Sequence, residues 1–347
     1  MVLEKLFCKF NMINKNRIQV VSKSQHINSK ELKKIRKLLT NLPQELKSKI
    51  NNIPYIIFSI ENVKYKMRVN HDEIQNQNFI VHISRDFLRQ FLENQKEVKE
   101  KKIFYSYILH ELIHIRHHQS KYLKQVRTAI NELCHSLSNN FNQAQKLIGK
   151  KNCYPNLVKA IHLLEVFDPD LPDLLFVNKE KMKQLSLVIR LKLFELSSQL
   201  HSEGLASLFE FWYAEQISFD ESEYNQKYNE AYAYAKKIRK LFAIFVKAKN
   251  IFKFNSKEFE EEFSETTYNA ACSVGFHICL TLITIGKASL KSLLNISHYQ
   301  FLKKYEECMN KIVVRPIISL NSGKGVIDYN KILKTWNKLD KKIVKIE

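Results

Sequence analysis

The sequence has little of the residues that break regular structure. Among 347 residues there are six glycines and six prolines. Tight turns depend on these two residue types, so their scarcity argues against a many-stranded β architecture and favours long helices. The hydrophobic fraction of 45% lies well above that of disordered chains. A chain of this length can bury a large core in one domain or two.

Cysteine is also sparse, and its spacing excludes one common kind of site. No C-x-x-C pair is present, so a Cys-rich zinc ribbon is not expected. Most of the cysteines stand in apolar helical contexts, where a free thiol behaves as a small hydrophobe. No secretory signal is recognised near Met1, so we expect a reducing, cytoplasmic location. The six are Cys8, Cys134, Cys153, Cys272, Cys279 and Cys308.

Long hydrophobic runs are missing as well. The most apolar run, residues 270–285, is too short to span a bilayer comfortably and carries His277. We expect it to be a core helix and expect no membrane span. The net charge of +21 comes from lysines scattered between Lys5 and Lys345, without an arginine-rich block. We interpret the charge mainly as a solvated surface, with nucleic acid as a possible partner supported by charge alone.

The stretch that organises the chain is residues 103–116, which contain His110-Glu-Leu-Ile-His114. This is an H-E-x-x-H pattern in an apolar segment without glycine or proline. On a helix, residues four apart lie on one face, so His110 and His114 can hold one metal ion. Glu111 is rotated by about 100° from His110, which allows its carboxylate to act on a bound water. The pattern predicts a buried metal-binding helix.

Catalytic zinc usually has three protein ligands, so a further carboxylate or imidazole is needed. Glu203 is favoured because Gly204 follows it. A glycine inside an apolar helix is intrinsically unfavourable and indicates close approach of another element, expected beside the 103–116 helix. Glu132, in Asn131-Glu-Leu-Cys-His135, is the alternative. His117 and His118 are alternative further ligands, but a ligand three residues after His114 would crowd the same turn. They are expected to end the motif helix, because histidine is favourable near a helix C-terminus.

The segment before the motif changes its hydrophobic period. Residues 29–42 have helical spacing, while residues 53–60, 63–69 and 79–84 have the composition or alternation of strands. Residues 79–84 are a candidate edge strand that could pair with an extended peptide, or an ordinary internal strand. Residues 219–229 are polar and are predicted to form a loop.

The two motifs, His110-Glu-Leu-Ile-His114 and Glu203-Gly-Leu-Ala206, resemble those of gluzincin zinc metallopeptidases of the MA clan. The resemblance implies a predominantly helical α+β, zincin-like fold with a small N-terminal sheet. It also implies Zn²⁺ bound by His110, His114 and Glu203, with Glu111 as general base. Members of this group use a tyrosine or histidine from a later helix to support the oxyanion. Tyr268 is favoured for that role because it shares a helix face with small residues.

These observations predict three parts: an α/β part in residues 1–102, a helical zinc-binding part in residues 103–310, and a basic tail in residues 311–347. A helical insertion is expected at residues 119–198. The predicted function is zinc-dependent hydrolysis of a peptide or protein substrate. One alternative is a DNA-associated SprT-like zinc protease, for which His135 would be the third ligand. Another is a non-catalytic interaction protein with a structural metal site. The sequence does not indicate an oligomeric state.

Overall fold

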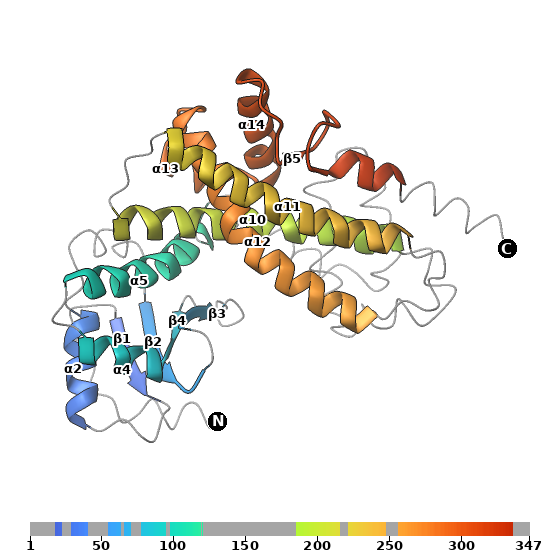
Figure 1. Ribbon diagram of the computed structural model, residues 1–347. Helices are drawn as coiled ribbons and strands as arrows, with labels where there is room; N and C mark the ends of the chain where they lie inside the picture. Colours follow the sequence, from blue (N-terminus) through green and yellow to red (C-terminus); the bar gives the residue numbers. More distant parts are fainter. Residues whose placement is uncertain are drawn as a thin grey trace. The chain divides into compact units, whose positions relative to one another are not determined.

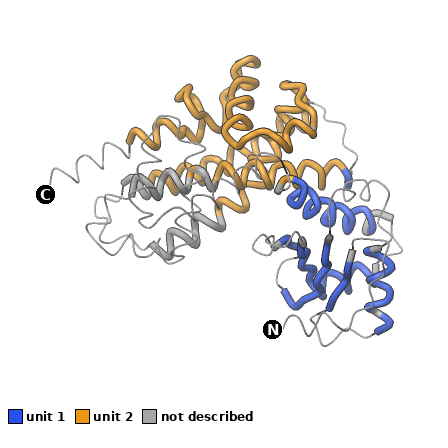
Figure 2. The backbone as a smooth tube through the Cα atoms, turned by 180° about the vertical axis from the view of Figure 1, so that it is seen from behind, with its two compact units in different colours: residues 1–116, 213–215 blue, residues 117–212, 216–347 orange. Residues whose placement is uncertain are grey.

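The computed structural model forms two compact units, which comprise residues 1–116 with 213–215 and residues 117–212 with 216–347 (Figure 2). Helices dominate and the strands form small sheets, so the α+β class predicted from the sequence is confirmed. The structure describes residues 18–22, 29–40, 55–63, 66–70, 78–94, 98–118, 120, 185–215, 221–247 and 256–335.

The first unit combines a mixed sheet with helices that flank its strands in the chain (Figure 1). Its helix α2 covers most of residues 29–42, for which the sequence predicts helical structure. In chain order its elements are β1 (Ile18–Ser22), α2 (Ser29–Thr40), β2 (Tyr55–Glu61), β3 (Met67–Asn70), β4 (Asn78–Ser84), α4 (Arg85–Asn94) and α5 (Val98–His118), of which residues 117 and 118 belong to the second unit.

The strand order of this sheet is β1-β2-β4-β3, with β3 antiparallel to β4 and the other pairs parallel. Residues 79–84 were predicted to form either an edge strand or an internal strand. The internal position is observed, since β4 pairs with both β2 and β3. The burial pattern explains this order. Side chains of β2 are buried at consecutive positions, as expected of a strand covered on both faces, whereas Met67, Arg68 and Val69 of β3 alternate between buried and exposed. Among the described strands, β3 therefore lies at an edge.

Aromatic packing joins α4 to α5 within the first unit. The rings of Phe91 and Phe104 stack with centroids 4.1 Å apart, and Phe87 meets Tyr107 edge to face at 5.4 Å. Phe104 is almost fully buried, as are Leu88 of α4 and Ile108 of α5. Burial of side chains of this size contributes about 1.5–3 kcal/mol each, so α5 is held firmly in the first unit.

The second unit consists mainly of long helices. A loop was predicted for residues 219–229, and this prediction was wrong for residues 221–229, because the helix already begins at Glu221. Its polar sequence is supported by tertiary contacts, because Tyr224 donates or accepts a 3.0 Å hydrogen bond with the Thr281 hydroxyl. The described elements are α10 (Leu185–Glu215), α11 (Glu221–Lys247), α12 (Ser256–Thr284), α13 (Leu290–Leu293), α14 (His298–Lys311), β5 (Ile318–Ser319) and β6 (Ile327–Asp328).

Part of the segment predicted as a basic tail is instead buried in the second unit. Strands β5 and β6 pair in parallel, and both are fully buried. Tyr329 follows them and donates a 3.1 Å hydrogen bond to the carbonyl of Leu193 in α10. The boundary between the units lies at residue 116, whereas the sequence predicted it at residue 102. The reason is that the apolar face of α5 packs in the first unit.

Candidate metal centre on helix α5

Helix α5 presents the H-E-x-x-H residues as the sequence predicts. His110 and His114 are one turn apart, and their ring centroids are separated by 4.8 Å. His110 is half-buried and His114 is buried, with 5% of its surface exposed. Two imidazoles on one face of a rigid helix provide two of the ligands that a zinc ion needs.

The carboxylate of Glu111 is held in place by the neighbouring sheet. Its Oε2 accepts a 2.8 Å hydrogen bond from the backbone N–H of Val69 in β3. Glu111 is buried, with 8% of its surface exposed. A carboxylate needs such a partner when it leaves water, so the edge strand both stabilises and orients this side chain.

A second polar contact joins the loop before β3 to α5. Lys66 Nζ donates a 2.7 Å hydrogen bond to the Tyr107 hydroxyl, one turn before Glu111. Leu112 and Ile115 are fully buried and hold this part of the helix in the apolar core. The first unit by itself therefore positions two histidines and a carboxylate in a defined orientation.

Glu203, the favoured third ligand, is half-buried in α10 and belongs to the second unit. The thiol of Cys272 in α12 donates a 3.9 Å hydrogen bond to its Oε2. Burial and then the negative charge of Glu203 raise the pKa of the Cys272 thiol to about 12, so the thiol stays protonated and can act as this donor.

The close approach predicted at Gly204 is confirmed, but its partner differs from the one expected. Gly204 lies against Gly275 of α12, and a Cβ added to Gly204 would meet the Gly275 carbonyl carbon at 2.3 Å. The prediction placed the 103–116 helix there. Two helical backbones come this close only where both residues lack a side chain, and the pair sets the position of Glu203 relative to α12.

Tyr268 lies on α12, one turn before Cys272, and 57% of its surface is exposed. It is on the helix face that reaches Glu203 and Gly204 further along, as the spacing predicts. Its proposed role at an oxyanion stays a prediction. His277 is fully buried on another face of α12, as expected of a residue in the core helix predicted for residues 270–285. Glu132 and His135 lie outside the described residues.

The sequence did not indicate a second group of histidines in the second unit. His117 ends up buried in the last turn of α5, beside His201 of α10 and His298 of α14. Helix α5 ends at His118, as expected, but His117 does not serve as an exposed C-terminal residue. Its partners are distant in the chain, so no local spacing marks the group.

Comparison with known proteins adds no identification: no family model, curated protein or solved structure matches the chain. Among the described helices, none is both long enough and apolar enough to cross a membrane. The described cysteines, Cys272, Cys279 and Cys308, are free thiols, as predicted. Functional inference therefore depends on the side chains themselves.

Proposed function

We propose that this chain is a zinc-dependent metallopeptidase. The observation that supports this best is the arrangement of His110, Glu111 and His114 on a buried helix beside an edge strand. Burial of two imidazoles and a carboxylate is costly unless they have partners or a ligand. The same three residue types at this spacing form the metal-binding and catalytic core of many zinc hydrolases.

His110, His114 and Glu203 are the proposed zinc ligands. Two imidazoles and one carboxylate form a donor set suited to catalytic zinc, which keeps a further position for water or substrate. The choice of Glu203 is supported within the second unit, where the neighbouring Gly204 packs directly against Gly275 of α12 and so fixes the place of Glu203 on α10.

A zinc ion bound there would lower the pKa of a water and polarise a carbonyl. Glu111 is then the proton acceptor for the attacking water, and it returns the proton to the leaving amine. The Val69 N–H keeps the Glu111 carboxylate from rotating between these two tasks. Tyr268 is proposed to donate a hydrogen bond to the oxygen on which negative charge develops.

The substrate proposed is an extended peptide that pairs with β3. The Ser84 N–H donates a hydrogen bond to the Lys66 carbonyl. Backbone groups alternate in direction along an antiparallel strand, so those of Arg68 also face β4. The backbone groups of Met67 and Val69 therefore point away from β4. Glu111 uses the outward N–H of Val69, and the carbonyl of Val69, which points the same way, is proposed to pair with the main chain of the peptide. The peptide would thereby lie beside the proposed general base.

The test compares Glu111→Gln with Glu93→Gln, a change at an exposed carboxylate of α4. Each full-length variant is assayed for zinc content and for hydrolysis of a mixed library of quenched fluorescent peptides. We expect Glu111→Gln to keep its zinc and lose turnover by at least about a thousandfold, while Glu93→Gln behaves as wild type. Unchanged turnover in Glu111→Gln would refute the assignment, and a wild-type protein without zinc or turnover would favour a non-catalytic role.

A further inference from the structure

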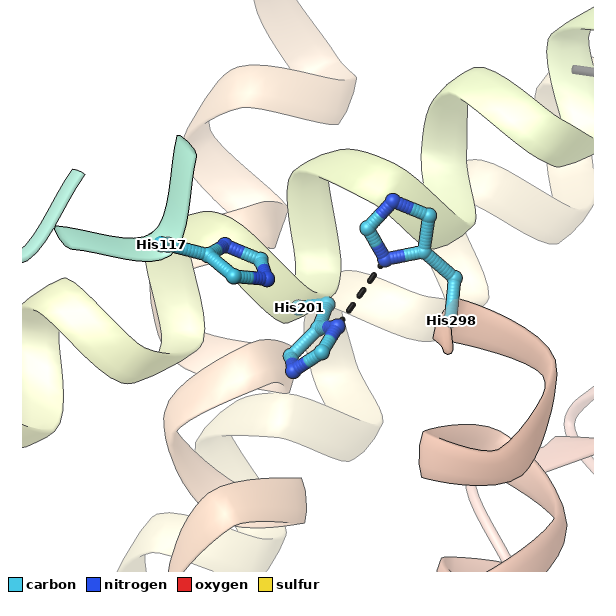
Figure 3. Close-up of side chains that lie close together, drawn as sticks. All are labelled: His117, His201 and His298. Carbon is cyan, nitrogen blue, oxygen red and sulfur yellow. Dashed lines mark hydrogen bonds between the residues drawn. The ribbon is translucent and has the colours of Figure 1, made fainter. Parts of the chain in front are cut away.

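Three histidines from three helices converge in the core of the second unit (Figure 3). His117 lies in the last turn of α5, His201 lies in the middle of α10 and His298 begins α14. No more than 2% of the surface of any of them is exposed. Each offers a ring nitrogen, and these three nitrogens lie within 4.8 Å of one another. The group shares no residue with the proposed catalytic site.

The hydrogen bonds of His201 define the tautomers of two rings. Its Nε2 lies 2.8 Å from the carbonyl oxygen of Leu293, which can only accept, so this nitrogen carries a proton. In a neutral ring Nδ1 then holds a lone pair. The Nδ1 of His298 lies 2.9 Å away and must be the donor (Figure 3). The lone pair of His298 is consequently on Nε2.

Neutral rings are favoured in this environment. Burial lowers the pKa of His201 well below its ordinary value, and the nearby His298 lowers it further. Burial, followed by the effect of His117, does the same for His298. Neutral imidazole is the form that binds metals, and the direction of both shifts favours that form for His201 and His298.

The bond to Leu293 is also the arrangement expected of a metal-binding histidine. Such a ring binds the metal through one nitrogen and donates a hydrogen bond from the other, usually to a carbonyl or a carboxylate. His201 already has its Nε2–H in that bond and its Nδ1 directed into the cluster. Its ring also stacks on Phe301, with centroids 4.2 Å apart, which limits rotation.

We propose that His117, His201 and His298 bind a divalent transition-metal ion of the zinc class, at a site separate from the one on His110 and His114. Metal–nitrogen bonds of about 2.0–2.1 Å in a tetrahedral arrangement place ligand nitrogens about 3.4 Å apart. The two Nδ1 atoms are 2.9 Å apart, so they need to separate by about half an ångström. The third nitrogen lies within the 4.8 Å range and moves inward.

Binding changes one tautomer and no oxidation state. The metal takes the lone pair of His201 Nδ1 and replaces the hydrogen bond between the two rings. The proton of His298 leaves Nδ1 for Nε2, which gives the metal the Nδ1 lone pair, and the ring stays neutral. The ion would join the ends of α5 and α14 to the middle of α10. Because the ion would bind the folded chain and not the unfolded chain, it would stabilise the second unit.

The test counts metal ions in the full-length protein after loading with Co²⁺ and dialysis. The variants are His298→Asn, His201→Gln and the double variant His110→Asn/His114→Asn. We expect His298→Asn and His201→Gln each to hold one ion per chain fewer than wild type. The double variant is expected to keep the ion that they lose. If it holds none while wild type does, or if His298→Asn matches wild type, the proposal is overturned.

A second measurement guards against variants that do not fold. X-ray absorption of Zn²⁺ in the His110→Asn/His114→Asn protein reports which atoms surround the ion that remains. Three imidazoles would support the site, whereas a mixture of oxygens and fewer than three imidazoles would contradict it. This protein lacks the proposed catalytic ligands, so the measurement does not depend on the peptidase proposal. If no ion binds at His110 and His114, wild type binds one ion, and only the His298 and His201 variants lose it.

Discussion

Gly204 of α10 and Gly275 of α12 are in backbone contact. A Cβ on Gly275 would lie 2.1 Å from the carbonyl oxygen of Leu200 and 2.8 Å from the Cα of Gly204, so neither helix can accept a side chain at the crossing. The crossing lies next to Glu203 and to the thiol of Cys272 that binds it. The position of the proposed third ligand thus depends on a glycine pair in which neither residue carries chemistry.

Gly204→Ala is therefore expected to destabilise the fold by about 3 kcal/mol, because the added carbon overlaps main-chain atoms rather than a flexible side chain. At an unobstructed helix position the change from glycine to alanine would stabilise the fold by about 1 kcal/mol. The sign of the change in unfolding free energy therefore shows whether Gly204 is in close contact. Urea unfolding measures the difference. Ser198→Ala, at a half-buried position of the same helix, is the control and is expected to stay within about 0.5 kcal/mol of wild type. A neutral or stabilising Gly204→Ala would contradict the contact.

Val69→Pro tests the orienting role of the edge strand. Proline removes the N–H that binds Glu111, and it is tolerated at edge strands. We expect turnover to fall about ten- to a hundredfold, since a hydrogen bond to a charged group contributes about 1.5–3 kcal/mol. Zinc content is expected to be unchanged. Val69→Ala loses the same buried side chain but keeps the N–H, so it is the matched control and should retain most activity. Equal losses in both variants would assign the effect to packing.

The choice of third ligand is tested by Glu203→Gln and Glu132→Gln, measured separately for zinc content against a series of chelator concentrations. An amide is a much poorer zinc ligand than a carboxylate, so the true ligand loses affinity by at least about a hundredfold. We expect that loss in Glu203→Gln and near wild-type affinity in Glu132→Gln. The reverse pattern would replace Glu203 by Glu132. Each protein is loaded with one equivalent of zinc, and the zinc affinity of the His110→Asn/His114→Asn variant is measured in parallel. This variant lacks the proposed catalytic site, so the comparison shows whether the lost affinity belongs to that site.

What could be predicted from the sequence was local. The spacing of His110 and His114 and their apolar flanks defined α5, because both signals lie within one helix. Gly204 indicated a close approach, but Gly275 could not be named as the partner from distant sequence. The helical start at Glu221 was missed for the same reason: its support comes from Thr281, 57 residues after Tyr224. His201 and His298 are 97 residues apart, and only the folded chain brings their rings together.

His277 gives the protein an expected dependence on pH. It is fully buried in α12, where the described titratable groups in ring contact with it are Tyr224 and Tyr228 of α11 and Tyr305 of α14. Burial lowers the pKa of His277 to about 3. In the unfolded chain its pKa is about 6.5, so between these values the unfolded state binds a proton that the folded state does not.

Folding stability should therefore be unaffected by His277 above about pH 6.5 and should fall as the pH drops below it, with a slope of about 1.4 kcal/mol per pH unit. Urea unfolding at pH 7.5 and pH 5 measures this directly. Wild type is expected to lose about 2 kcal/mol more than His277→Gln over this interval. Thr281→Val removes the hydroxyl 3.4 Å from His277 Nε2 without removing the titrating group, so it should keep the wild-type slope. If His277→Gln keeps that slope too, then His277 is protonated in the folded protein and its side chain reaches solvent.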